Sequence, residues 1–176
     1  EAFQQFDSRP ELAYVKKVVN YTAKYSNVKN LDLAKTPALI PAKDSLELLR
    51  FTFSNLKKHN VFDHIVPVLI DDRSTRQEEM RELADEYRAI YIRMDYDSPT
   101  FNFSMINNAA AAFLKAVGSK DIILWNSDLW VDNDKVIPYL LDKHKSRKEE
   151  DFYATGVKLL YPTRGFCELM DDEKFI

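Results

Sequence analysis

One segment of the chain joins an apolar run directly to an acidic turn: IVPVLIDDRST, residues 65–75. The run over residues 65–70 has no polar alternation, which is typical of a strand that is buried on both faces. The turn begins with two adjacent carboxylates, Asp71 and Asp72, which repel each other and stay solvated unless they meet donors or a cation. The segment therefore predicts a strand that is buried on both faces, in a mainly parallel sheet, with polar residues at its carboxyl end.

Similar apolar runs recur along the chain, and segments with helical spacing separate them. The other runs cover residues 38–40, 89–92 and 122–125, the helical segments cover 45–59, 77–87, 104–117 and 134–145, and a later strand is expected at 152–161. Strands that alternate with helices in this way predict right-handed βαβ units. We therefore expect an α/β fold of Rossmann-like type, with a mainly parallel sheet flanked by helices.

The length of 176 residues suits one domain with a substantial core. Residues 1–35 are polar with helical spacing, and Thr36-Pro37 breaks that pattern. We expect a helical N-terminal extension over residues 1–35 and the main domain over residues 36–176.

Composition excludes several function classes. Lys and Arg number 25 and Asp and Glu 28, so the net charge of −3 argues against a nucleic-acid partner. The single cysteine, Cys167, cannot build an internal disulfide framework, which favours a reducing compartment. No apolar run is long enough for a transmembrane helix, and no signal peptide is visible. With only 3 glycines, the dinucleotide-binding and P-loop fingerprints are nearly excluded.

Polar residues gather where the apolar runs end. In open α/β sheets, ligands bind outside the carboxyl ends of the strands, so these positions are the candidate site. An oxygen-rich turn such as Asn126-Ser127-Asp128 suits Mg²⁺ or Mn²⁺, with Asp128 as the charged ligand. The structural alternatives are a polar turn at Asp128 and helix capping by Asp72 or Ser74.

The helical segment 104–117 also has an unusual start. Ser104 is a plausible N-cap, and a helix N-terminus favours anions. Asn107 and Asn108 are poor helix formers in the first turn, so a reason other than helix propensity is expected to keep them there. Simple exposure to solvent is the alternative explanation.

Taken in order, these segments resemble the family 2 glycosyltransferases, which have the GT-A nucleotide-sugar fold. The likeness covers roughly residues 36–162, is strongest to the branch that builds bacterial polysaccharides and O-antigens, and is specific only as an ordered set. Asn126-Ser127-Asp128 resembles the DxD motif of that branch. The other matching segments are Ala38-Leu39-Ile40-Pro41-Ala42-Lys43-Asp44, Val68-Leu69-Ile70-Asp71-Asp72-Arg73-Ser74-Thr75, Phe101-Asn102-Phe103-Ser104-Met105-Ile106-Asn107-Asn108-Ala109-Ala110 and Gly156-Val157-Lys158-Leu159-Leu160-Tyr161-Pro162.

The resemblance implies an enzyme that transfers a sugar from a nucleoside-diphosphate donor to a glycan or lipid-linked acceptor hydroxyl, generally with inversion. It implies that Asp71 or Asp72 holds the base or ribose, and that Asp128 coordinates a divalent cation, Mn²⁺ or Mg²⁺, which bridges the diphosphate. The implied nucleotide-sugar-binding residues are Pro41, Ala42, Lys43, Asp71, Asp72, Asn108, Asn126 and Ser127. The catalytic base is expected beyond this chain, which matches only the donor-binding half of the family.

The chain departs from the family pattern at several positions. Asn126 stands where many members have the first Asp of DxD, Arg73 replaces the usual Gly, and Ala109 or Ala110 replaces a common Gly. Two other functions stay open: a non-catalytic nucleotide-sugar-binding or interaction module of a larger polysaccharide-assembly protein, and a sugar nucleotidyltransferase. The second class usually has a Gly-rich basic loop, and no glycine precedes Gly118. A cytoplasmic location, including the inner membrane face, is expected.

Overall fold

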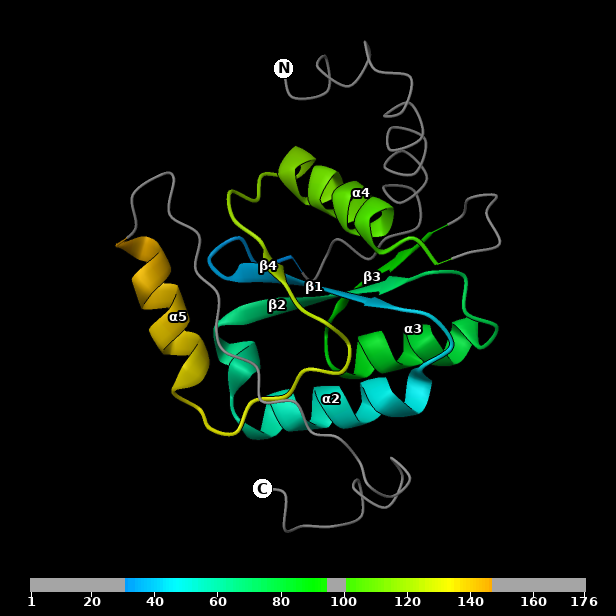
Figure 1. Ribbon diagram of the computed structural model, residues 1–176, viewed down its shortest axis with the longest axis horizontal. Coiled ribbons are helices and arrows are strands. Elements are labelled where there is room, and N and C mark those ends of the chain that lie inside the picture. The colour runs from blue at the N-terminus through cyan, green and yellow to red at the C-terminus, as the bar shows by residue number, and fades with distance from the viewer. Residues whose placement is uncertain (1–30, 95–100, 147–176) are drawn as a thin grey trace.

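The computed structural model describes residues 31–94 and 101–146, which form a four-stranded, all-parallel sheet flanked by helices (Figure 1). The strands are β1 (Thr36–Ala42), β2 (Ile65–Asp71), β3 (Ile90–Arg93) and β4 (Ile123–Leu124). The helices are α2 (Leu46–Lys58), α3 (Gln77–Glu86), α4 (Phe103–Ala116), α5 (Val136–Lys145) and the short 3-10 helix η2 (Val61–Asp63). The expected α/β class with a parallel sheet is confirmed.

The bounds of β1 to β4 and of α2 to α5 agree with the sequence-based expectations to within two residues at each end, and η2 was not predicted. Residues 31–35, the end of the expected helical extension, contain a turn instead of a helix. The Asp32 side chain accepts a hydrogen bond from the Ala34 N–H, and its carbonyl accepts one from Lys35, an arrangement that competes with helix formation. Residues 1–30 of that extension and the strand expected at 152–161 lie outside the described residues.

The strand order is β3-β2-β1-β4. The chain adds β2 and β3 on one side of β1 and then adds β4 on the other side, so the strand order reverses at β1. β1, the first strand, lies between β2 and β4 and is parallel to both. In open α/β sheets the crevice at such a reversal, outside the carboxyl ends of the strands, is where ligands bind. In this sheet, that position lies between the carboxyl ends of β1 and β4.

Prolines are unusual inside a sheet because they cannot donate to the hydrogen-bond ladder. The Leu39 carbonyl accepts from the Trp125 N–H and the Ala42 carbonyl accepts from the Asp72 N–H. The backbone nitrogen and carbonyl of odd-numbered β1 residues therefore point towards β4. The backbone nitrogens of Pro37 and Pro41 accordingly point towards β4, and β4 pairs only with Ala38 and Leu39. Both prolines of β1 therefore lie where β4 needs no donor.

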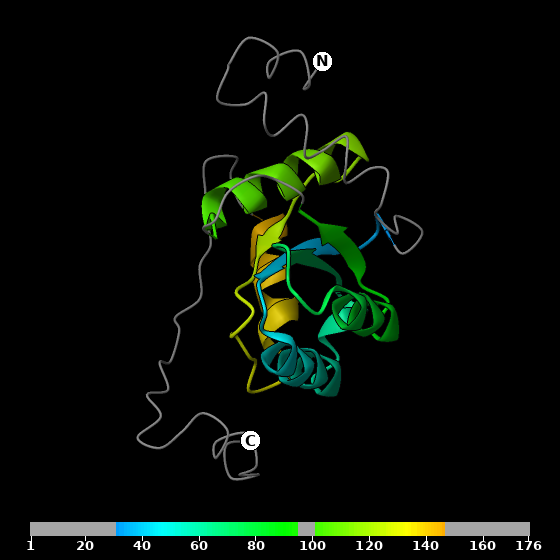
Figure 2. The same cartoon turned by 90° about the vertical axis from the view of Figure 1, so that its right-hand side faces the viewer.

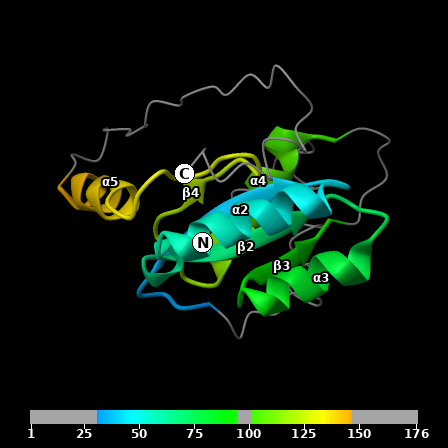
Figure 3. The ribbon, with the colours of Figure 1, turned by 90° about the horizontal axis from the view of Figure 1, so that it is seen from below.

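The sheet is buried on both faces, as the continuous apolar runs predicted. Helices α2 and α3 cover one face, and α4 covers the opposite face (Figures 1 and 2). Alternation along β1 sends Ala38 and Ile40 to the α2–α3 side and Leu39 to the α4 side. Figure 3, seen from below, shows α2 and α3 over the sheet, with α5 to one side.

The last described helix, α5, completes the core on the α2 side. Ile137 is buried in the same apolar cluster as Trp125 and Val131. His144 near the end of α5 lies 3.0 Å from Asp121, which precedes β4. Within the ranges 31–94 and 101–146, no helix is long and apolar enough to span a membrane.

Candidate site at the carboxyl edge of the sheet

The sheet brings the expected strand-end residues to one edge. Ala42 at the end of β1 pairs with Asp71 at the end of β2, and Asp71 pairs with Arg93 at the end of β3. On the other side of β1, Leu124 pairs with Leu39, so residues 126–128 follow towards the same carboxyl edge. Parallel strands end on one side of their sheet, and the candidates are therefore gathered there.

Asp71 is fully buried and anchors the turn after β2. Its Oδ1 accepts a hydrogen bond from the Ser74 N–H at 2.8 Å, and its Oδ2 accepts from the Tyr91 hydroxyl at 2.5 Å and from Arg93 Nη1 at 2.8 Å. Burial raises the pKa of the Tyr91 hydroxyl, and its bond to Asp71 adds to this, so the phenol stays a donor at neutral pH. The carboxylate serves internal contacts here, and its role towards a base or ribose stays a prediction.

Asp72 is also fully buried, although it lies in the turn. Its N–H donates to the Ala42 carbonyl at 2.8 Å, and its Oδ1 accepts from Arg73 Nε at 3.0 Å. Its Oδ2 has no hydrogen-bond partner among the described residues. Arg73 has a φ of 59°, in the left-handed region that favours glycine, at the position where the family resemblance expects Gly.

The turns after β1 and β2 are tied to each other. The Asp44 N–H donates to Ser74 Oγ at 2.9 Å, and Asp44 Oδ1 accepts from the Thr75 N–H at 2.7 Å and the Thr75 hydroxyl at 2.9 Å. These bonds, the backbone one first, hold the pKa of the Asp44 carboxyl below its usual value. Neither Asp72 nor Ser74 caps α3, whose N-cap residue is Arg76 without a side-chain cap.

The expected pocket residues of β1 differ in exposure. Pro41 and Ala42 are buried within the strand, and their place in a nucleotide pocket stays a prediction. Lys43, directly after the strand, is half-buried. A lysine there can reach an anion at the edge while its methylene chain packs against the protein.

The turn after β4 presents its polar side chains to solvent. We define the β4 loop as residues 125–131. Asn126 and Asp128 are exposed and Ser127 is half-buried. Trp125 is buried, and its indole Nε1 donates to the Leu129 carbonyl at 3.0 Å across the loop. The loop therefore folds around a buried indole and leaves the Asp128 carboxylate accessible.

The start of α4 differs from the expectation. Ser104 is not the N-cap; Asn102 is, with its side chain accepting from the Met105 N–H at 3.0 Å. Asn102 has extended backbone angles and Ser104 already lies inside the helix, so only Asn102 can cap. Asn107 is buried and its Nδ2 donates to the Phe103 carbonyl at 2.8 Å, whereas Asn108 is exposed. Asn107 Oδ1 is buried without a hydrogen-bond partner among the described residues, and the exposure of Asn108 agrees with the alternative explanation, so a ligand-related role for these asparagines stays a prediction.

A complete metal cage of protein side chains is not present in the part of the chain that the structure describes. No group of three or more His, Cys, Asp or Glu side chains converges there. Asp128 is accordingly a single carboxylate, with the Asn126 amide as a neutral neighbour in the same loop. Mg²⁺ is commonly held by one or two carboxylates together with substrate phosphates and water, and this donor set fits that pattern.

No protein-family model and no curated protein matches the chain.

Sequence reasoning missed the residues that support this edge. Tyr91 and Arg93 hold Asp71 from β3, and Thr52 and Asn55 contact the β4 loop from α2. The partners of Asp71 follow from strand register, which the sequence does not state. Thr52 did leave a signal, because a hydroxyl stands there on the otherwise apolar face formed by Leu49, Phe53 and Leu56.

Proposed function

We propose that this chain is the donor-binding domain of a metal-dependent glycosyltransferase acting on a nucleoside-diphosphate sugar, with a glycan or lipid-linked acceptor. The observation that carries the proposal is the exposed Asp128 in the turn after β4, beside the position where strand order reverses. The proposal is supported by the general position of ligands at the carboxyl ends of strands in α/β sheets, and by the resemblance of residues 126–128 to a DxD motif. The cytoplasmic location expected from the sequence belongs to the same proposal.

The chemistry of the edge suits a sugar diphosphate. When bound, a divalent cation would neutralise the charge that develops on the diphosphate leaving group. Asp128 would hold that cation, Asn126 would donate or accept a hydrogen bond beside it, and Lys43 would add a positive charge from the β1 side. The acceptor hydroxyl would need a base, which we place beyond the described residues.

Calorimetry with UDP, GDP and dTDP, each with and without Mn²⁺, tests the proposal. We expect one nucleotide to bind with metal present, and Asp128→Ala to weaken that binding at least tenfold, because the charged ligand is lost. Asp134→Ala is the matched control, since Asp134 is another exposed acid six residues further along. Absence of binding by the wild type under every condition, or equal binding by Asp128→Ala, would overturn the proposal.

The non-catalytic alternative predicts the same binding and differs only in turnover. A binding module would hold the donor without hydrolysing it or transferring its sugar. Release of nucleoside diphosphate from the donor is followed with the wild type and with Asp128→Ala. Metal-dependent release that Asp128→Ala abolishes supports the enzyme, whereas binding without release agrees both with the module and with a donor-binding domain that lacks the base.

A further inference from the structure

A buried hydroxyl on α2, that of Thr52, forms hydrogen bonds with the β4 loop. Thr52 is fully buried in the middle of α2, on the face that otherwise carries Leu49, Phe53 and Leu56. Burying a hydroxyl is unfavourable unless it forms hydrogen bonds. An apolar side chain of the same shape would suit this position better if packing were its only role.

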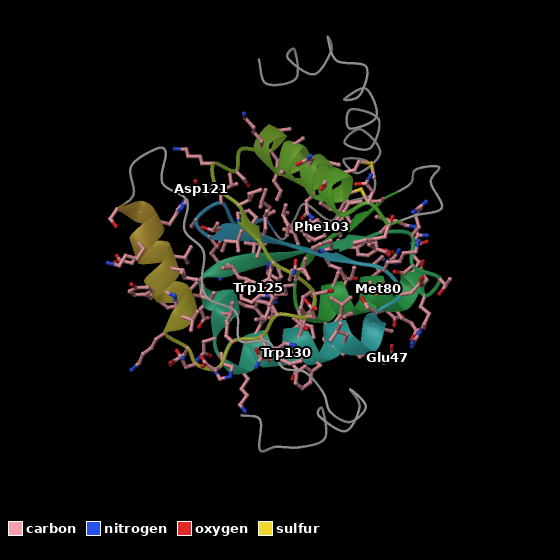
Figure 4. The ribbon with its side chains drawn as sticks, in the orientation of Figure 1. Glu47, Met80, Phe103, Asp121, Trp125 and Trp130 are labelled. Atoms are coloured by element: carbon pink, nitrogen blue, oxygen red, sulfur yellow. The ribbon has the colours of Figure 1, made fainter. Side chains whose placement is uncertain are left out.

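Both hydrogen bonds of this hydroxyl go to the β4 loop. Thr52 Oγ1 donates to the Ser127 carbonyl at 2.6 Å and accepts from Trp130 Nε1 at 3.1 Å. In the sequence, Ser127 stands between Asn126 and Asp128, the two residues that the proposed function uses. Figure 4 shows Trp130 over α2, where its ring meets Phe51 edge to face at 4.9 Å between centroids.

One helical turn later, Asn55 makes a second attachment. Its Nδ2 donates to the Val131 carbonyl at 3.1 Å, and its Oδ1 accepts from the Val131 N–H at 3.0 Å. A side-chain amide that satisfies both backbone groups of one residue fixes the position and direction of the chain there. The loop is thus attached to α2 at Ser127, Trp130 and Val131, while the side chains of Asn126 and Asp128 are exposed.

We propose that Thr52 and Asn55 are positioning residues, which hold the β4 loop so that Asn126 and Asp128 are set for the cation and diphosphate before the donor arrives. This inference rests on the proposed function. When a group that orients a metal ligand without binding the metal is removed, the metal affinity typically falls ten- to a hundredfold. Neither residue is expected to touch the donor, so their effect passes through the backbone of the loop.

The test compares Thr52→Val, which keeps the shape and removes the hydroxyl, with Thr52→Ser, which keeps the hydroxyl. The probe is the nucleoside diphosphate among UDP, GDP and dTDP that the wild type binds best with Mn²⁺. We expect about tenfold weaker binding by Thr52→Val and binding within about twofold of wild type by Thr52→Ser. Hydrogen exchange of residues 126–131 should rise in Thr52→Val only, with β1 and β2 unchanged.

A control variant separates positioning from general loss of stability. Leu83→Val alters the buried face of α3 and should lower stability while leaving nucleotide binding and loop exchange unchanged. Equal binding by Thr52→Val and the wild type, or equal weakening by Leu83→Val, would overturn the inference. If the wild type bound no nucleotide, the proposed function would fail, and loop exchange in Thr52→Val would still decide whether Thr52 holds the loop.

Discussion

The turn after β2 and the turn after β4 leave the same edge of the sheet, yet their acidic residues are buried to opposite degrees. Asp71 and Asp72 are fully buried and bonded to neighbouring protein groups, whereas Asp128 is exposed. In the β2 turn the Asp71 carboxylate accepts hydrogen bonds from protein groups, whereas the β4 loop is bound to α2 through the backbone of Ser127 and Val131 and the Trp130 indole. The comparison separates a carboxylate that stabilises the edge, that of Asp71, from one that is accessible to a ligand, that of Asp128.

Replacing Asp71 should give the largest effect on stability. Asp71→Ala leaves the Arg93 charge, the Tyr91 hydroxyl and the Ser74 N–H without their partner in a largely buried place. Breaking a buried ion pair from one side costs about 3–5 kcal/mol, a large share of the stability of a typical domain. Urea denaturation followed by circular dichroism measures the loss.

Asp128→Ala is the matched control for this comparison, because it removes an exposed carboxylate from the same edge. Its free energy of unfolding should stay within about 0.5 kcal/mol of wild type. If Asp71→Ala does not fold, Asp71→Asn gives a smaller, measurable loss, since the amide keeps an acceptor oxygen. Equal stability of Asp71→Asn, Asp128→Ala and the wild type would contradict the division between a structural and an accessible acid.

The sequence predicted the strands and helices well because their signals are local. The apolar run over residues 65–70 became β2 with one further residue, and 104–117 became α4 shifted by one residue. The roles of the acids were not predictable in the same way. The partners of Asp71 lie 20 and 22 residues away on β3, and only strand register brings them to it.

The cap of α4 shows a second limit of sequence reasoning. Asn102 and Ser104 are both residue types that cap helices, so their identity does not choose between them. The choice depends on where the chain leaves its extended conformation, and in the structure this happens at Asn102. Residue type narrows the candidates to two, and the extended backbone angles at Asn102 select one.

A smaller effect is expected at Arg73, where backbone strain and side-chain bonding can be separated. Arg73→Ala and Arg73→Gly both remove the hydrogen bond to Asp72, but only glycine adopts the φ of 59° without strain. Arg73→Gly should therefore be about 1 kcal/mol more stable than Arg73→Ala. Both free energies come from urea denaturation, and a less stable glycine variant would show that the β2 turn relaxes out of this conformation.

The smallest effect concerns the pH dependence of stability, through the exposed hydrogen bonds between Asp44 after β1 and Thr75 after β2. The hydrogen bonds from Thr75 lower the pKa of Asp44 in the folded state. A lowered folded-state pKa means that the stabilisation is complete above the unfolded value, about 3.9, and is lost as pH falls through the folded value. The urea midpoint of the wild type should exceed that of Asp44→Asn by a constant amount between about pH 6 and 8, and the difference should shrink below about pH 4. Asp134→Asn, which alters no bond to the β2 turn, should show no comparable change of the urea midpoint with pH. If the difference in midpoint between the wild type and Asp44→Asn persisted at low pH, the loss of stability in Asp44→Asn would not come from the carboxylate charge.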